Sequence, residues 1–66
     1  MELNKSKILL LMAERGYNMR TLSDTAELGR DTLNKWLNHG TKPRLDKVGG
    51  LAKALGVSVE QIIIMD

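Results

Sequence analysis

Apolar residues recur along most of this chain at intervals of three and four positions, the spacing that puts them on one face of an α-helix. In the stretch GRDTLNKWLNHG, residues 29–40, the apolar side chains are Leu33, Trp36 and Leu37, and they share such a face. No segment shows the strict alternation of a half-buried β-strand, and VSV, residues 57–59, is too short to count as one. The pattern therefore predicts an all-α fold.

Glycines and helix-start residues divide the chain into five predicted helices. The first runs from about Asn4 to Arg15 and ends at Gly16, a residue type favoured just beyond a helix C-terminus. The second begins at Asn18, a favoured N-cap, and continues through MRTLSDTA. The third is residues 29–40, after a break at ELG. Helices this short are not stable alone, so each is expected to be held by tertiary packing.

The third predicted helix is followed by a loop, TKPRLD, in which Pro43 cannot donate a backbone hydrogen bond. The fourth helix stops at Gly56, and its apolar stripe consists of Leu45, Val48, Leu51, Ala52 and Leu55. Inside it, Gly49–Gly50 costs about 1 kcal/mol per glycine relative to alanine, which indicates either close helix packing or a locally weak helix. The fifth begins at Ser58, with Gln61 at the spacing of a capping box, and continues into IIIM.

Length and composition narrow the class of protein. With 66 residues the chain makes a single domain, near the lower size limit for folding without disulfides or metal, and it has no cysteine. Its net charge of +2 permits nucleic-acid binding without arguing for it. The longest apolar run, Ile8–Ala13, is too short to span a bilayer, and the N-terminus lacks a signal-peptide pattern. We therefore expect a soluble cytoplasmic protein that does not bind membranes.

The sequence carries no pattern of catalytic groups. There is no Ser/His/Asp set, no carboxylate pair suited to acid–base chemistry and no glycine loop that would cradle a phosphate. The single histidine, His39, is expected to be solvated or to cap the third helix, and Trp36 is expected to lie in the core. The sequence thus predicts a protein that is not an enzyme and that has no metal, no cofactor and no small-molecule ligand.

The second and third predicted helices, joined by a tight turn, form the unit that presents its second helix to a DNA major groove. With the apolar face of the third helix inward, its outward residues are Arg30, Asp31, Asn34 and Lys35. They mix donors and acceptors at the helix start, where a groove-reading helix makes its base contacts. The cations of these two helices and the following loop are Arg20, Arg30, Lys35, Lys42 and Arg44. This placement favours DNA binding over a merely solvated surface.

The stretch NMRTLSDTAELGRDTLNKWLNHGTKPRLDKVGGLAKALGVSVEQI resembles the lambda-repressor-like helix-turn-helix family, the XRE-type domains of phage Cro and repressor proteins. The resemblance covers nearly the whole chain, and its strongest parts are ALGVSVEQI and the apolar register of Leu22, Ala26, Leu28, Leu33 and Trp36. It implies a compact five-helix DNA-binding domain in which helices two and three form the helix-turn-helix. It also implies a sequence-specific transcriptional regulator of phage or bacterial origin.

The resemblance further implies roles by position. The family's base-reading sites fall on Arg30, Asp31 and Lys35, with Thr32 and Asn34 as flanking candidates. Its phosphate-contacting sites fall at the start of helix two and around the loop, on Asn18, Met19, Arg20, Asn38, Thr41, Lys42 and Arg44. Arg30 suits a bidentate contact to guanine and Lys35 a guanine edge. Asp31 suits either the amino group of cytosine or the orientation of Arg30.

The chain departs from the family pattern at several positions. The turn position usually held by glycine is Glu27, with Gly29 two residues later, and NHG is one residue longer than the usual end of helix three. Some members have a buried Arg–Glu pair where this chain has Met12 and Leu37. We expect these two residues to pack together as an apolar substitute that needs no desolvation of charge.

The end of the chain is strongly apolar. Ile62 and Ile63 are expected to complete the core against the first helix, whereas Ile64 and Met65 exceed what so small a monomer needs to bury. This surplus favours a homodimer interface. Combined with the resemblance, it implies a Cro-like repressor that binds a pseudo-palindromic operator in double-stranded DNA, although activation through contact with a polymerase is equally compatible with the sequence. Two alternatives remain open. One is an antitoxin-like module that neutralises a protein partner, with DNA binding secondary, and the other is a developmental regulator that forms heterodimers.

Overall fold

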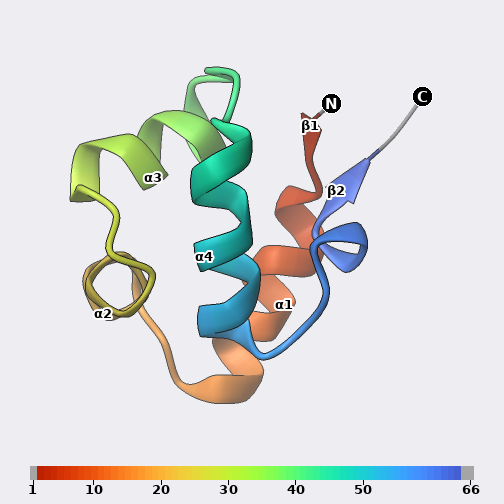
Figure 1. Cartoon of the computed structure of the whole chain (residues 1–66). Coiled ribbons are helices and arrows are strands. Elements are labelled where there is room, and N and C mark those ends of the chain that lie inside the picture. The colour runs from red at the N-terminus through yellow and green to blue at the C-terminus, as the bar shows by residue number, and fades with distance from the viewer. Residues whose placement is uncertain (1, 65–66) are drawn as a thin grey trace.

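Four α-helices make up most of residues 2–64, the part of the chain that the computed structural model describes. The helices are α1 (Lys5–Arg15), α2 (Met19–Thr25), α3 (Arg30–Asn38) and α4 (Leu45–Leu55). A 3-10 turn, η1 (Val59–Gln61), and two short strands, β1 (Glu2–Leu3) and β2 (Ile63–Ile64), complete the fold. Figure 1 shows α4 in the middle, with α2 and α3 on one side and α1 and the strands on the other. None of these helices has the length and apolar character needed to cross a membrane.

Two asparagine side chains determine where the first two helices begin. Asn4 precedes α1, and its Oδ1 accepts a hydrogen bond of 3.1 Å from the backbone N–H of Lys7. Asn18 precedes α2, where its Oδ1 accepts from the Thr21 N–H at 2.8 Å and its own N–H donates to the Thr21 hydroxyl at 2.9 Å. Such caps pair donors that the first helical turn leaves free, at about 1 kcal/mol each. The predicted starts of both helices are confirmed.

Helices α1, α2 and α4 end alike, each in a residue with positive φ followed by a hydrogen bond across six residues. After α1 and α4 this residue is glycine, Gly16 with φ 71° and Gly56 with φ 74°. After α2 it is Glu27, with φ 58°, and the next N–H, of Leu28, donates to the carbonyl of Ser23 at 2.8 Å. This left-handed backbone costs a non-glycine residue about 1–2 kcal/mol. The turn before α3 therefore keeps the geometry of a glycine turn under strain.

The end of the chain differs from the predicted fifth helix. Residues Val59–Gln61 form only η1, and Ser58 makes no side-chain capping hydrogen bond, so the predicted capping box is wrong. Ile63–Ile64 forms β2, which pairs antiparallel with β1. Branched isoleucine side chains lose freedom in a helix and fit a pleated strand, and β1 supplies the partner. Residues 2–64 thus form four α-helices and a small sheet instead of the five helices of an all-α domain.

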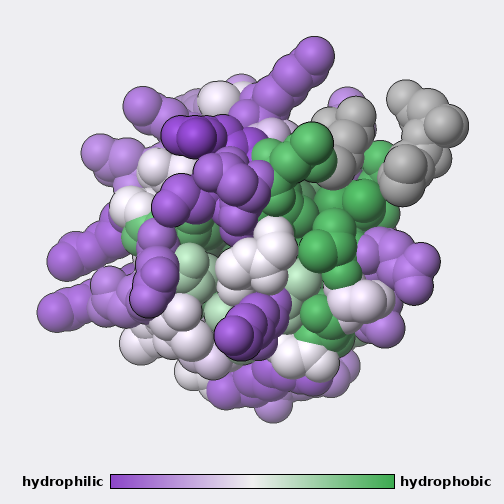
Figure 2. All heavy atoms as spheres, viewed as in Figure 1, coloured by the Kyte–Doolittle hydropathy of each residue, from purple (hydrophilic) through white to green (hydrophobic). Residues whose placement is uncertain are grey.

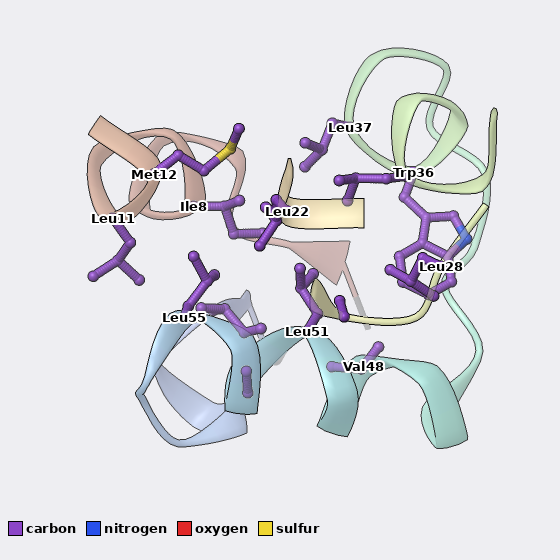
Figure 3. Close-up of a cluster of buried hydrophobic side chains, with 14 residues drawn as sticks. Ile8, Leu11, Met12, Leu22, Leu28, Trp36, Leu37, Val48, Leu51 and Leu55 are labelled. Carbon is purple, nitrogen blue, oxygen red and sulfur yellow. The ribbon is translucent and has the colours of Figure 1, made fainter. Parts of the chain in front are cut away.

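The core lies between the four helices, where side chains from each helix point toward one another (Figure 3). Its members are Ile8, Leu11, Met12, Leu22, Ala26, Leu28, Leu33, Trp36, Leu37, Val48, Leu51, Ala52, Leu55 and Ile62. Trp36 is buried and Ile63 packs against the cluster beside buried Ile62, so the core roles predicted for these three residues are confirmed. Met12 and Leu37 lie in the same apolar cluster, as the expected substitute for an ion pair requires.

Leu45 departs from the predicted stripe of α4. Its side chain is 77% exposed, although Val48, Leu51 and Leu55 farther along the same helix are buried. Leu45 is the first residue of α4, and this end of the helix lies beside the loop from α3, at the rim of the molecule (Figure 1). Helical spacing alone assigned it to the core, but in the folded chain this first residue of α4 stays exposed beside the loop.

The two adjacent glycines of α4 play different parts. A Cβ at Gly49 would meet nothing within 4 Å, whereas one at Gly50 would lie 3.2 Å from the carbonyl oxygen of Ala26. Gly50 therefore marks a close approach of α4 to the end of α2, the packing alternative predicted for this pair. Gly49 has no such neighbour and only weakens the helix.

Among the described residues, Ser23 in α2 is the polar residue that the fold buries. Its side chain is fully buried, and its hydroxyl oxygen has no hydrogen-bond partner among residues 2–64. An unpaired buried hydroxyl costs about 1–3 kcal/mol. Nothing in the hydrophobic periodicity distinguishes Ser23 from the exposed polar residues around it, so sequence reasoning did not single it out.

Candidate nucleic-acid interface

Helices α2 and α3 form a helix-turn-helix. In Figure 1, α2 is seen end-on while α3 lies across the view, so the two helices cross at a steep angle. The turn between them contains Glu27 and then Leu28, which is buried and anchors the turn to the core. Figure 2 shows hydrophilic side chains over α2 and α3, and hydrophobic ones gathered near the strands. On the face seen in Figure 2, the helix-turn-helix thus carries a polar surface.

Helix α3 has the two faces that its sequence predicts. Leu33, Trp36 and Leu37 are buried, and they fix the inner face against the core. The exposed residues of the outer face are Arg30, Asp31, Asn34 and Lys35, while Thr32 is half-buried at its edge. The predicted division into faces is confirmed, and the base-reading role of these residues stays a prediction.

The charged groups at the start of α3 are free of one another. Among residues 2–64 the ion pairs are Arg15–Glu14 and Arg44–Asp46, so neither Arg30 nor Lys35 is neutralised by another residue of this part of the chain. Asp31 does not orient Arg30 through an ion pair here. Its carboxylate lies in the first turn of α3, where the helix dipole favours a negative charge. Both cations therefore remain available to an external acceptor.

The predicted phosphate contacts at the start of α2 differ in their availability. Arg20 is exposed, whereas Asn18 already uses its side-chain oxygen in the capping box. Met19 is half-buried and packs against the core, so its side chain has a structural role. The backbone at the helix start and the Arg20 guanidinium are the groups here that suit a phosphate.

The loop after α3 carries the other predicted phosphate contacts. Thr41, Lys42 and Arg44 are all exposed. Arg44 pairs with Asp46 at 3.3 Å on the surface, a contact worth about 0–1 kcal/mol, so exchanging it for a phosphate costs little. His39 is exposed and caps the C-terminus of α3, as predicted, and Gly40 takes φ 66°. This left-handed residue turns the chain sharply into the loop.

Sequence reasoning missed Lys5, which the fold brings to the outer side of α3. Its Nζ donates a hydrogen bond of 3.1 Å to Oδ1 of Asn38, which lies 33 residues away in the sequence. Nδ2 of Asn38 in turn donates to Oδ1 of Asn34. No local pattern at Lys5 could have revealed this contact, because it depends on the fold bringing the start of α1 near the end of α3.

Comparison with known families agrees with this geometry. The model of the Cro/C1-type HTH DNA-binding domain matches residues 7–66, which includes most of α1 and the whole of α2, α3 and α4. The chain belongs to this family. No curated protein sequence matches it. The resemblance inferred from the sequence is confirmed, and this Cro/C1-type domain is a DNA-binding regulator whose macromolecular partner is DNA.

Proposed function

We propose that this Cro/C1-type domain is a Cro-like transcriptional repressor that binds a pseudo-palindromic operator as a homodimer, with α3 in the major groove. The observation that carries the proposal is the division of α3 into two faces. The buried inner face ties α3 to the core, so its outer side chains project from a fixed backbone. Base reading requires donors and acceptors held in register, which such a helix supplies.

The exposed residues of α3 match the groups on base edges. The guanidinium of Arg30 has the donor geometry for O6 and N7 of one guanine, and Lys35 suits the same acceptors as a single charge. The carboxylate of Asp31 suits the amino group of cytosine. These three residues are the proposed readers, with Thr32 and Asn34 beside them.

Cations around α3 suit the phosphate backbone on either side of the groove. Arg20 lies at the start of α2, and Lys42 and Arg44 lie in the loop after α3, all exposed. Asp24 and Glu27 reduce the positive charge of this side of the domain. We therefore expect weak binding to random DNA and a large share of the affinity from contacts to bases.

The homodimer is proposed to form through the apolar end of the chain. Ile64 is 46% exposed on β2, and Met65 lies outside the described residues. A two-fold dimer would bind two half-sites one helical turn, about 34 Å, apart. A sedimentation experiment should give a dimer for the unaltered chain and a monomer for Ile64→Lys. A chain that remains monomeric both alone and on its operator contradicts this part of the proposal.

Selection from a library of random duplex DNA tests the function directly. The protein should enrich an inverted repeat whose half-site centres lie about 10 base pairs apart. Enrichment of one asymmetric half-site would contradict dimeric binding. Enrichment of no sequence at low salt, where phosphate contacts are strongest, would contradict sequence-specific recognition itself.

Two matched variants separate base reading from phosphate contact on the selected operator. Arg30→Ala should lose about 1–3 kcal/mol of binding free energy and relax the preference at one base pair. Lys42→Ala should weaken operator and random DNA about equally and lower the dependence of log K on log salt by about one unit. Equal losses on operator and random DNA for Arg30→Ala would exclude Arg30 as a reader.

An antitoxin-like protein-interaction module is the second candidate, and the exposed leucines of α1 favour it. Leu9 and Leu10 are 46% and 53% exposed, an apolar surface that DNA does not require. This function predicts that Leu9→Glu/Leu10→Glu leaves operator binding intact and abolishes binding to a protein partner. Gel filtration with and without operator DNA separates the two candidates. A monomer that does not bind DNA at low salt would support only the protein-interaction function.

A further inference from the structure

A chain of hydrogen bonds runs from the start of α1 to the outer face of α3. Lys5, the first residue of α1, donates from Nζ to Oδ1 of Asn38 at 3.1 Å. Asn38, the last residue of α3, donates from Nδ2 to Oδ1 of Asn34, one helical turn earlier. All three side chains are exposed. This series of hydrogen bonds therefore ends at Asn34, a residue beside the proposed base readers.

The ammonium group of Lys5 fixes the direction of donation along these hydrogen bonds. Side-chain amides can be turned by 180°, but an ammonium has three donors and no acceptor. Asn38 must therefore present its oxygen to Lys5, which leaves its NH₂ to donate onward. Asn34 must then accept through its oxygen. The NH₂ group of Asn34 is the part of its amide that stays free.

We propose that Lys5 and Asn38 are positioning residues that hold Asn34 with its NH₂ toward the DNA, so that Asn34 reads a base bearing an acceptor. This inference rests on the proposed function, in which α3 lies in the major groove. Guanine O6 and N7 and thymine O4 are such acceptors, and the amino group of cytosine is not. A bidentate contact to adenine needs both the oxygen and the NH₂ of the amide, and the hydrogen bond from Asn38 already uses one of the two lone pairs of that oxygen and fixes its direction, which disfavours this contact.

The orientation of the Asn34 amide has its effect in the complex with DNA. In the free protein the exposed hydrogen bonds compete with water and are weak. Binding removes water from around α3 and lowers the local dielectric, which strengthens each hydrogen bond and raises the cost of an unpaired one. An Asn34 that turned its amide in the groove would leave Asn38 and Lys5 with a mismatched donor.

Substitutions along the chain of hydrogen bonds make opposite predictions about the base opposite Asn34. Asn38→Asp has only acceptors at this position, so Asn34 should turn and present its oxygen, which favours cytosine or adenine. Lys5→Met frees both amides, so adenine should become acceptable. Lys5→Arg retains a donor-only group and should keep the original preference. Lys7→Met removes a charge from the same helix and serves as the control.

The measurement is base preference at each operator position, from selection of random duplex DNA by the unaltered protein and each variant. At one position per half-site, Asn38→Asp should change the ratio of guanine or thymine to cytosine or adenine by about threefold to tenfold. Lys5→Arg and Lys7→Met should leave that ratio unchanged. If Lys5→Met and Asn38→Asp preserve every preference and only weaken all DNA alike, Lys5 contacts phosphate and the positioning role is wrong.

An NMR measurement on the free protein distinguishes this inference from the proposed function. Lys5→Met should shift the side-chain NH₂ signals of Asn38 and Asn34, and Lys7→Met should shift neither. Shifts in these signals without any enriched DNA sequence would overturn base reading by α3 and, with it, the role assigned to Asn34. An enriched operator with no such shifts would leave the proposed function standing and overturn the chain of hydrogen bonds.

Discussion

Replacing Glu27 by glycine should stabilise this Cro/C1-type domain. Glu27 ends α2 with φ 58°, in the same turn geometry that Gly16 and Gly56 adopt after α1 and α4. A side chain in this conformation costs about 1–2 kcal/mol. Relief of this strain by glycine is offset by about 0.5–1 kcal/mol, because the unfolded chain has more conformational freedom with glycine at this position. The expected net effect is about 1 kcal/mol of added stability.

Thermal unfolding followed by far-UV circular dichroism measures this effect. For a domain of this size, about 1 kcal/mol corresponds to a rise in Tm of roughly 4–8 °C. Urea unfolding should move its midpoint at unchanged slope, because neither the folded core nor the exposed surface changes. Agreement between the two assays would tie the gain to the free energy of unfolding.

Two controls isolate the backbone as the cause. Glu27→Ala removes the carboxylate but keeps the Cβ, so it should change stability by less than about 0.5 kcal/mol. Gly16→Ala adds a Cβ at the equivalent turn, where nothing lies within 4 Å, and should lose about 1 kcal/mol. The reasoning is refuted if Glu27→Gly leaves Tm unchanged, or if Glu27→Ala raises Tm equally.

Further predictions concern other points of the packing. Gly49→Ala should gain about 0.5–1 kcal/mol in urea unfolding, whereas Gly50→Ala should gain less or lose, because its Cβ would lie 3.2 Å from the carbonyl that ends α2; equal gains would contradict that close approach. Ser23→Ala should gain about 1 kcal/mol more than Ser6→Ala at an exposed site of α1, and equal changes would mean that the buried hydroxyl finds a partner. Tyr17→Phe should lose about 1 kcal/mol in thermal unfolding, because the Tyr17 hydroxyl donates to a carbonyl of α4 at 3.1 Å. An unchanged Tm would contradict that bond.

Local chemistry made the helix starts and most of the core predictable. Asn4 and Asn18 each accept a hydrogen bond from a residue only three positions away, so a short stretch of sequence is enough to predict these caps. The inner face of α3 was predictable because Leu33 and Trp36 follow the helical period. Such features depend on short-range geometry, which a sequence displays directly.

Features that depend on distant parts of the chain were not predictable in the same way. The isoleucine run is equally apolar as a helix or a strand, and pairing with β1, some 60 residues earlier, decides between them. The exposure of Leu45 depends on which elements pack beside the first turn of α4. The hydrogen bond from Lys5 to Asn38 needs the finished fold, as does the burial of Ser23. In each case the deciding neighbour lies outside the window that periodicity examines.

The pairing of β1 with β2 brings the two ends of the described chain close together. Leu3 lies opposite Ile63, so the two ends of the described chain leave from adjacent strands, about 5 Å apart in a sheet. Both strands lie on the side of α4 away from α2 and α3 (Figure 1). A peptide of a few residues therefore suffices to circularise the domain, or to fuse two copies in tandem, without crossing the surface of α3. Although each strand is only two residues long, the sheet determines how this domain can be joined to others.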